Sequence, residues 1–237
     1  PRLRLSPPPP GVRCPPRARR GAGTGQAPGM RRFLLAQFSP VLQAWRNGYE
    51  GEVRRSVIAF FVLILLAFGV CLAVPEVRLG LSAYLQGFYQ DMDLTDETGA
   101  LSPLALFLNN LRACVVTMLY GLIPYVRMPA LALGMNAVVL GGMAAVYAAA
   151  DSTMLLFAAG LLPHGIFELP ALIMSFSMGL YVCGHLTRRV RGDSTALSLR
   201  RCASLSMRLL VFLVLPLLIL AAVTEAYVTP LVMGLFL

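Results

Sequence analysis

A run of nineteen residues without a charged side chain, Ser56 to Val74, constrains the fold of this chain more than any other feature. A helix of that length crosses roughly 30 Å of hydrocarbon, whereas the apolar core of a signal peptide is only about 7 to 15 residues long. Four more apolar runs follow, over about 103–125, 128–150, 153–183 and 207–229. The sequence therefore predicts an all-α, polytopic membrane helix bundle with about five transmembrane helices, which we number as spans one to five.

The composition agrees with a membrane protein and argues against other classes. Hydrophobic residues make up 57% of the chain and charged residues 13%, about half the usual charged share of a soluble protein. Every basic residue is an arginine, and these arginines crowd the N-terminal tail and the loops instead of forming a face with interleaved aromatics, so nucleic acid is not an expected partner. The five cysteines show no CxxC spacing. We predict no catalytic residue, cofactor or metal ligand set.

The N-terminal tail differs from the rest of the chain. Residues 1–29 are rich in Pro, Gly and Arg, a composition that cannot bury a core, so we expect this tail to be disordered. Met30 is the first methionine, and we expect it to be the natural start. Residues 30–237 are then expected to form a single membrane domain.

Two segments outside the spans are predicted to be amphipathic helices at the membrane surface. The first covers 31–55, where large apolar residues alternate with arginines. The second lies in the acidic connection 75–102, where apolar residues recur at helical spacing. This second helix either simply caps the bundle or docks a partner protein. The expected docking residues are Tyr84, Phe88, Asp91 and Asp93.

The loop charges predict the orientation of the chain. Positive residues concentrate on the cytoplasmic side of membrane proteins. Only Arg78 lies in a loop of the opposite side, whereas the expected cytoplasmic loops contain Arg31, Arg32, Arg46, Arg54, Arg55, Arg127, Arg188, Arg189, Arg191, Arg200, Arg201 and Arg208. We therefore expect a bacterial inner-membrane protein with its N-terminus in the cytoplasm and its C-terminus outside. Five spans satisfy that parity.

Several polar side chains lie inside the predicted spans, where an ionisable group is costly unless it is paired or functional. Arg112 and Glu168 fall at similar depth, which makes an ion pair between them geometrically feasible. His164 lies four residues before Glu168, so both share one helix face. The expected buried polar network comprises Asn109, Asn110, Arg112, Asn136, His164 and Glu168, while Glu225 is an additional acidic residue in span five.

Spans three and four carry packing signals. Span four is long for one straight crossing, and Pro163 and Pro170 flank its His-Glu element, so we expect this helix to be kinked or broken there. Span three repeats small residues at four-residue intervals, which permits close helix packing. The sequence leaves open whether the neighbour is in the same chain or in another copy, that is, whether the protein is a homo-oligomer.

With these residues considered, the chain from about Phe107 to Gly184 resembles the stage II sporulation protein M family. The resemblance rests on the Phe-Leu-Asn-Asn-Leu-Arg entry of span two, on Gly134 and Asn136, and above all on the run Leu-Pro-His-Gly-Ile-Phe-Glu-Leu-Pro around His164. It implies a compact core over about 103–185 in the bacterial cytoplasmic membrane. In spore formers, the founding member helps to localise a peptidoglycan-degrading complex.

Three functions remain open at this point. The resemblance implies a non-enzymatic scaffold that organises partner proteins, such as peptidoglycan hydrolases and other cell-wall-remodelling factors. The alternative is a transporter or permeation component, suggested by a titratable His-Glu pair beside a broken helix. A third alternative is an intramembrane hydrolase using His164 and Glu168 as acid/base groups or metal ligands, although a set of two ligands is incomplete.

Overall fold

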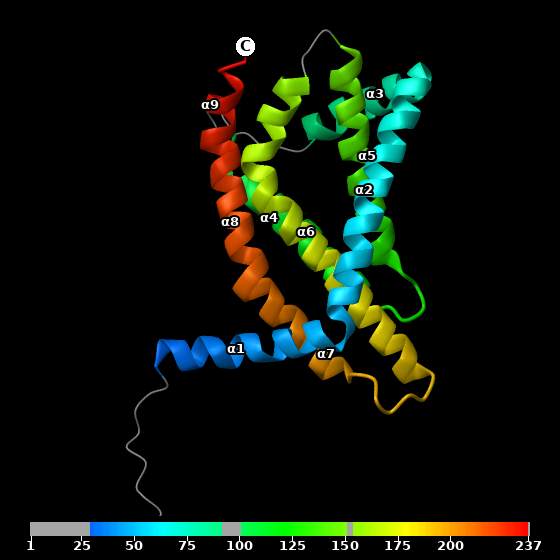
Figure 1. Cartoon of the computed structure of the whole chain (residues 1–237), viewed down its shortest axis with the longest axis vertical. Helices are drawn as coiled ribbons and strands as arrows, with labels where there is room; N and C mark the ends of the chain where they lie inside the picture. Colours follow the sequence, from blue (N-terminus) through cyan, green and yellow to red (C-terminus); the bar gives the residue numbers. More distant parts are fainter. Residues whose placement is uncertain (1–28, 92–100, 151–153, 237) are drawn as a thin grey trace, which may run out of the picture.

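The computed structural model describes residues 29–91, 101–150 and 154–236, and every element in them is helical. Five stretches are long and apolar enough to cross a membrane among these residues. They form an upright bundle, with one helix lying across each end (Figure 1). The predicted all-α polytopic bundle is therefore confirmed, whereas residues 1–28 of the predicted N-terminal tail lie outside the described residues.

The first span meets a horizontal helix at a sharp corner. Helix α1 (Met30–Ala44) lies almost perpendicular to α2 (Glu50–Ala73) at one end of the bundle, as expected for an interfacial helix (Figure 1). The corner falls in η1 (Trp45–Tyr49), where the backbone of Asn47 and Gly48 is not helical and Gly48 has a φ of 110°, a value that side chains disfavour. The surface helix predicted over 31–55 is thus shorter than expected, because Gly48 redirects the chain into span one.

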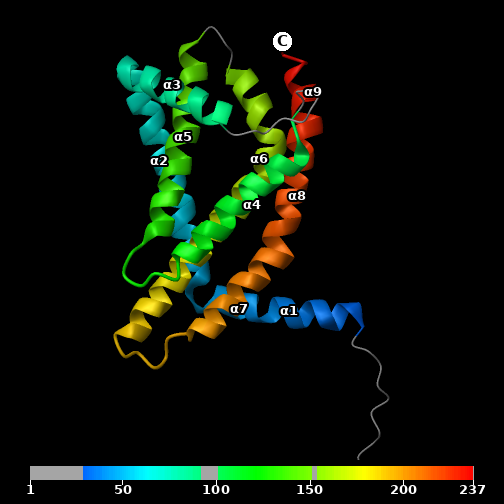
Figure 2. The same cartoon turned by 180° about the vertical axis from the view of Figure 1, so that it is seen from behind.

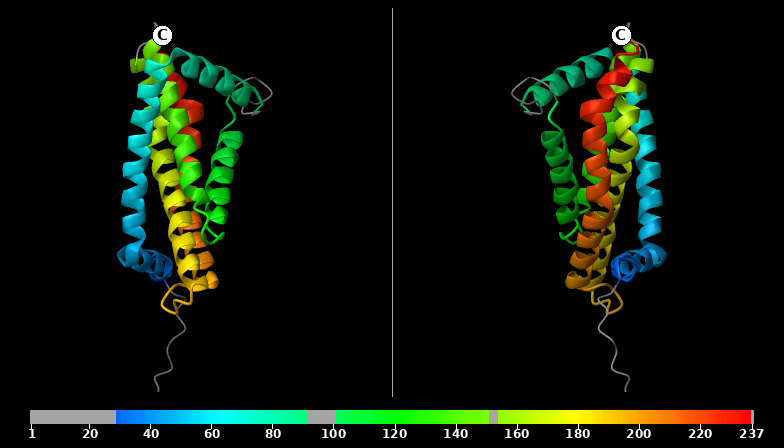
Figure 3. Two further views of the ribbon diagram at one scale, coloured as in Figure 1. Left: turned by 90° about the vertical axis from the view of Figure 1, so that its right-hand side faces the viewer. Right: turned by 90° about the vertical axis from the view of Figure 1, so that its left-hand side faces the viewer.

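The next elements are α3 (Pro75–Asp91), α4 (Pro103–Tyr120) and α5 (Met128–Ala149). The hydroxyl of Ser102 accepts a hydrogen bond from the amide of Ala105, and Pro103 occupies the first turn, so the start of α4 is well capped. Side views show α3 extending across the end of the bundle opposite α1 (Figure 3). The acidic connection therefore does contain a helix outside the spans.

Span four is α6 (Met154–Val190), a continuous helix despite Pro163 and Pro170. It changes direction in its first third, so the helix is kinked and not broken (Figures 1 and 2). Its middle, from Ala171 to Cys183, is almost entirely buried, and α6 packs against every other span. Such burial on all sides is typical of a central helix.

Span five is assembled from α7 (Leu199–Leu209), α8 (Leu215–Val223) and α9 (Thr229–Met233) with two π-helical turns between them. These turns are η2 (Leu210–Val214) and η3 (Thr224–Val228). Each turn ends two residues before a proline, Pro216 or Pro230. A proline ring collides with the carbonyl four residues earlier, and a locally widened helix relieves that clash.

The small-residue stripe of span three packs within the same chain. Ala137, Gly141 and Ala145 are buried, and α5 packs mainly against α2. A Cβ added to Gly141 would lie 2.4 Å from the carbonyl oxygen of Ile64, so only glycine allows this approach of the two helices. The stripe therefore joins spans one and three.

Candidate functional site

The kinked part of α6 presents an imidazole and a carboxylate to the bundle. His164 and Glu168 lie one helical turn apart, and the distance from His164 Nε2 to Glu168 Oε2 is 3.9 Å. The exposed fractions of the two side chains are only 13% and 19%. Two ionisable groups are therefore held in an apolar setting where charge must be compensated.

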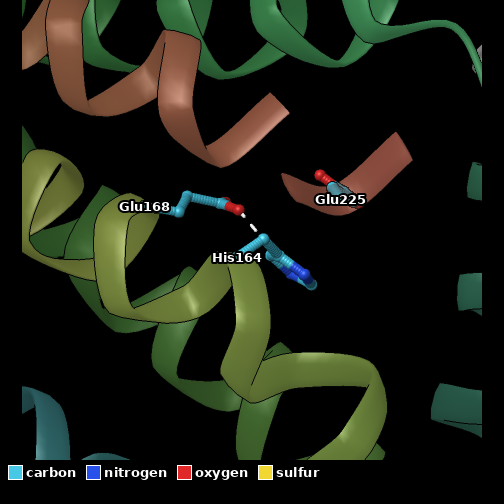
Figure 4. A group of neighbouring side chains, drawn as sticks. All are labelled: His164, Glu168 and Glu225. Carbon is cyan, nitrogen blue, oxygen red and sulfur yellow. Dashed lines mark ion pairs between the residues drawn. The ribbon is translucent and has the colours of Figure 1, made fainter. Parts of the chain in front are cut away.

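A second carboxylate reaches the pair from span five. Glu225 lies in η3, and its side chain points toward His164 and Glu168 (Figure 4). One donor atom from each of these three residues lies within 4.8 Å of the other two. We call His164, Glu168 and Glu225 the polar cluster.

The local shape of span five explains how Glu225 gets there. In the π-helical turn the Thr229 amide bonds to the Thr224 carbonyl, five residues earlier, so the extra residue rotates the helix face on which Glu225 lies. The hydroxyl of Thr229 also donates to the Thr224 carbonyl, at 3.2 Å. Pro230 follows at once and lacks the amide hydrogen that a regular helix would use.

Thr229 also determines the tautomer of His164. Its Oγ1 lies 3.3 Å from His164 Nδ1. Because the single hydroxyl hydrogen of Thr229 already points to the Thr224 carbonyl, Oγ1 acts as the acceptor and Nδ1 carries the hydrogen. In the neutral imidazole, Nε2 is then the unprotonated nitrogen, and it faces the Glu168 carboxylate.

Span two adds one polar group to the cluster. The side-chain amide of Asn110 lies beside the Glu168 carboxylate, where it can donate a hydrogen bond. Asn110 is half-buried on α4, which packs against α6 and α8. The site is thus built where spans two, four and five meet, and its residues can hold a cation or exchange protons.

The sequence model of the family described as stage II sporulation protein M matches residues 56–230. The match covers well over half of the chain. This chain belongs to the stage II sporulation protein M family. The match extends beyond the third of the chain that carries the resemblance, from span one through span five. Searches of curated proteins and of solved structures each found no match.

Within this family fold, the predicted ion pair between Arg112 and Glu168 is absent. Among the described residues, His164 is the only ion-pair partner of Glu168 within 4.0 Å. Arg112 is exposed on α4. Asn110 and Arg112 are two residues apart, which rotates their side chains by about 200° around a helix, so Asn110 faces α6 and Arg112 faces outward.

The remaining asparagines also lie outside the cluster's contacts. Asn136 on α5 donates from Nδ2 to the carbonyl oxygen of Ala132 in its own helix, at 2.9 Å. Asn109 is half-buried on α4, and the described residues include no hydrogen bond of its side chain. Of the six residues predicted to form one network, the structure brings together Asn110, His164 and Glu168.

The predicted docking residues lie on or just after α3. Tyr84 is exposed, with 58% of its surface accessible, whereas the neighbouring Leu85 is buried. Phe88 and Asp91 belong to the last turns of α3, but their side chains lie outside the described residues, and so does Asp93. Docking at this helix therefore stays a prediction.

Sequence reasoning named Glu225 as an acidic residue of span five but did not place it in the site, and it missed Thr229. A signal was present, because Thr224, Glu225 and Thr229 interrupt an otherwise apolar span shortly before Pro230. Polar residues just before a proline indicate a distorted helix whose polar groups need partners inside the bundle. The sequence does not tell how far this distortion rotates the helix. Only the three-dimensional structure shows that Glu225 is turned toward span four.

Proposed function

We propose that this family member is a non-enzymatic scaffold that holds partner proteins, such as cell-wall-remodelling factors, at the outer face of the bacterial cytoplasmic membrane. Membership of the stage II sporulation protein M family and five membrane-crossing stretches support a multi-pass membrane protein. The observation that carries the scaffold proposal is the placement of α3 outside the spans (Figure 3).

Helix α3 is fixed to the bundle by one face and exposed on the other. Leu85 is buried, and Leu81 packs so closely on Gly142 of α5 that an added Cβ there would meet the Leu81 side chain. In contrast, Leu79 and Tyr84 are largely exposed. A rigidly held helix with an exposed apolar and aromatic face offers a surface that a partner can bind at little entropic cost.

Photocrosslinking in living cells tests this proposal. A benzophenone amino acid placed at Tyr84 should crosslink to exported wall-remodelling proteins, identified by mass spectrometry. The matched control is Leu231 of α9, which is exposed at the same end of the bundle but belongs to a membrane-spanning stretch. Equal capture of these proteins at both positions, or none at Tyr84, would contradict a scaffold role for α3.

The proposal also specifies the orientation of the chain. The start of α5, which follows Arg127, and the arginine-bearing ends of α6 and α7 lie at the same end of the bundle as α1, and the C-terminus lies at the other end (Figure 1). The positive-inside rule then places α1 in the cytoplasm and α3 outside. A C-terminal alkaline phosphatase fusion should be active, and an N-terminal one inactive; the reverse pattern would overturn this orientation.

A transport role has one observation in its favour, the polar cluster between spans four and five. The continuity of α6 removes the argument from a broken helix, since there is no new helix terminus inside α6 to bind a solute. Ion flux into vesicles containing the purified protein, lost in Glu168→Gln, would favour transport over the scaffold.

A further inference from the structure

We propose that the polar cluster binds a divalent first-row transition metal ion, with His164, Glu168 and Glu225 as its ligands. The three side chains come from two different spans and converge so that one donor atom of each lies within 4.8 Å of the others (Figure 4). This inference is independent of the scaffold proposal, because it concerns the inside of the bundle and not α3.

The first argument is the charge that the bundle must compensate. Two carboxylates face each other across spans four and five, and no arginine of the described residues forms an ion pair with either. Placing an uncompensated carboxylate in an apolar interior is strongly unfavourable. A divalent cation between Glu168 and Glu225 would balance both charges at once.

The second argument is the hydrogen bonding of His164, which is independent of the carboxylates. The Thr229 hydroxyl accepts from Nδ1 and donates to the Thr224 carbonyl, so it selects the tautomer with a free electron pair on Nε2. That electron pair faces the Glu168 carboxylate, an arrangement that needs a positive charge between them, either a proton or a metal ion. Metal-binding histidines are commonly oriented by such a hydrogen bond at their other nitrogen.

Asn110 supports the same assignment from span two. Its side-chain amide lies beside the Glu168 carboxylate, where it can donate a hydrogen bond. Ligating carboxylates are usually hydrogen-bonded in this way, which fixes the oxygen that faces the metal. Each of His164 and Glu168 therefore has an orienting neighbour, Thr229 and Asn110 respectively.

The donor types select the class of ion. One imidazole nitrogen with two carboxylate oxygens suits Zn²⁺, Mn²⁺ or Fe²⁺, whereas Mg²⁺ and Ca²⁺ prefer oxygen ligands alone. Ligand atoms of a tetrahedral zinc ion are roughly 3.4 Å apart, given bonds of about 2.1 Å. The His164–Glu168 distance of 3.9 Å is close to that spacing, and the donor atoms of all three residues lie within 4.8 Å of one another.

Bound metal would connect the kink of α6 to the π-helical turn of span five. Both features are distortions that cost helix stability by themselves, and metal ligation would offset that cost. Three protein ligands leave at least one coordination position open for water or for a group supplied by another molecule.

The experiment uses the full chain, purified in detergent and freed of metal with a chelator. Addition of Zn²⁺ should give one bound ion per chain by elemental analysis and should raise the melting temperature. Co²⁺ should give visible ligand-field bands that Zn²⁺ displaces. Glu225→Gln should weaken Zn²⁺ binding by roughly 10- to 100-fold or more, and Glu225→Asp should restore part of it.

The control is Glu76→Gln, which removes an exposed carboxylate of α3 and should leave Zn²⁺ binding unchanged. Wild-type protein that binds neither Zn²⁺ nor Co²⁺ would overturn the proposal. Equal binding by folded Glu225→Gln would overturn it as well. If that variant does not fold, the wild-type Co²⁺ spectrum alone decides.

Discussion

Thr229 and His164 are 65 residues apart in the sequence, but Thr229 Oγ1 lies 3.3 Å from His164 Nδ1. This contact joins the last span to the kink of the central helix. Thr229 is 6% exposed, and its hydroxyl has both a donor and an acceptor role, with His164 on one side and the Thr224 carbonyl on the other. One small hydroxyl therefore positions the histidine relative to both carboxylates.

We predict that Thr229→Val, which keeps the side-chain shape but removes the hydroxyl, destabilises the protein by about 1 kcal/mol, the usual net contribution of one hydrogen bond. Chemical unfolding in detergent or bicelles measures this free energy. The control is Thr224→Val, whose hydroxyl donates to the Leu220 carbonyl of its own helix at 2.7 Å. Equal destabilisation by both substitutions would argue that the His164 contact contributes little.

Arg112 provides a second test, because it belongs to no described ion pair or hydrogen bond and faces outward from α4. A charged residue near the middle of a span costs about 3 kcal/mol on insertion scales. We therefore expect Arg112→Leu to leave the melting temperature unchanged or higher. Asn110→Leu, two residues earlier, should lower stability by about 1 kcal/mol because it removes a donor to Glu168. A loss in Arg112→Leu as large as that in Asn110→Leu would restore the ion-pair hypothesis.

The comparison of Arg112 with Asn110 indicates where sequence reasoning succeeds and where it fails. The spans and the kink in α6 follow from long apolar runs and from proline chemistry, which act locally and are readable in one dimension. The depth of a residue in the membrane is readable too, so Arg112 and Glu168 were reasonable partners. The direction of a side chain around its helix depends on how the helix is rotated in the bundle, and that rotation is decided by packing of all five spans.

Glu225 shows the same limit of sequence reasoning, here for a side chain that was not expected in the site but faces it. In a regular helix, each residue turns the side-chain direction by about 100° around the axis. The π-helical turn η3 departs from this step and so changes the direction in which Glu225 points. Pro230 signals the distortion without determining its size. The residues of the cluster could therefore be named from the sequence as buried polar groups, while their meeting in space could not.

The close contact between spans one and three leads to a third prediction. A Cβ at Gly141 would lie 2.4 Å from the carbonyl oxygen of Ile64, and backbone atoms cannot move aside as a flexible side chain can. We expect Gly141→Ala to destabilise the bundle by about 1 to 3 kcal/mol, the usual cost of overpacking. Gly69→Ala in α2 is the control, since nothing lies within 4 Å of its added Cβ. Gly69→Ala should be neutral or slightly stabilising, because alanine is the better helix former.

The fourth prediction concerns the effect of pH on Asp193 in the loop after α6. Asp193 accepts hydrogen bonds from the Thr195 amide at 2.9 Å and hydroxyl at 2.6 Å, and from Arg188 Nε at 2.8 Å. These bonds, first that of the Thr195 hydroxyl and then those of Arg188, hold the pKa of Asp193 at about 2, below its ordinary value of 3.8. A lowered carboxyl pKa favours the folded loop above the ordinary value, and this contribution is lost as the pH falls from about 4 toward 2. Thr195→Val and Arg188→Gln should therefore each raise the pKa of Asp193, as measured by carboxyl carbon NMR in micelles. A wild-type titration midpoint near 4 would show that the loop does not hold its hydrogen bonds in solution.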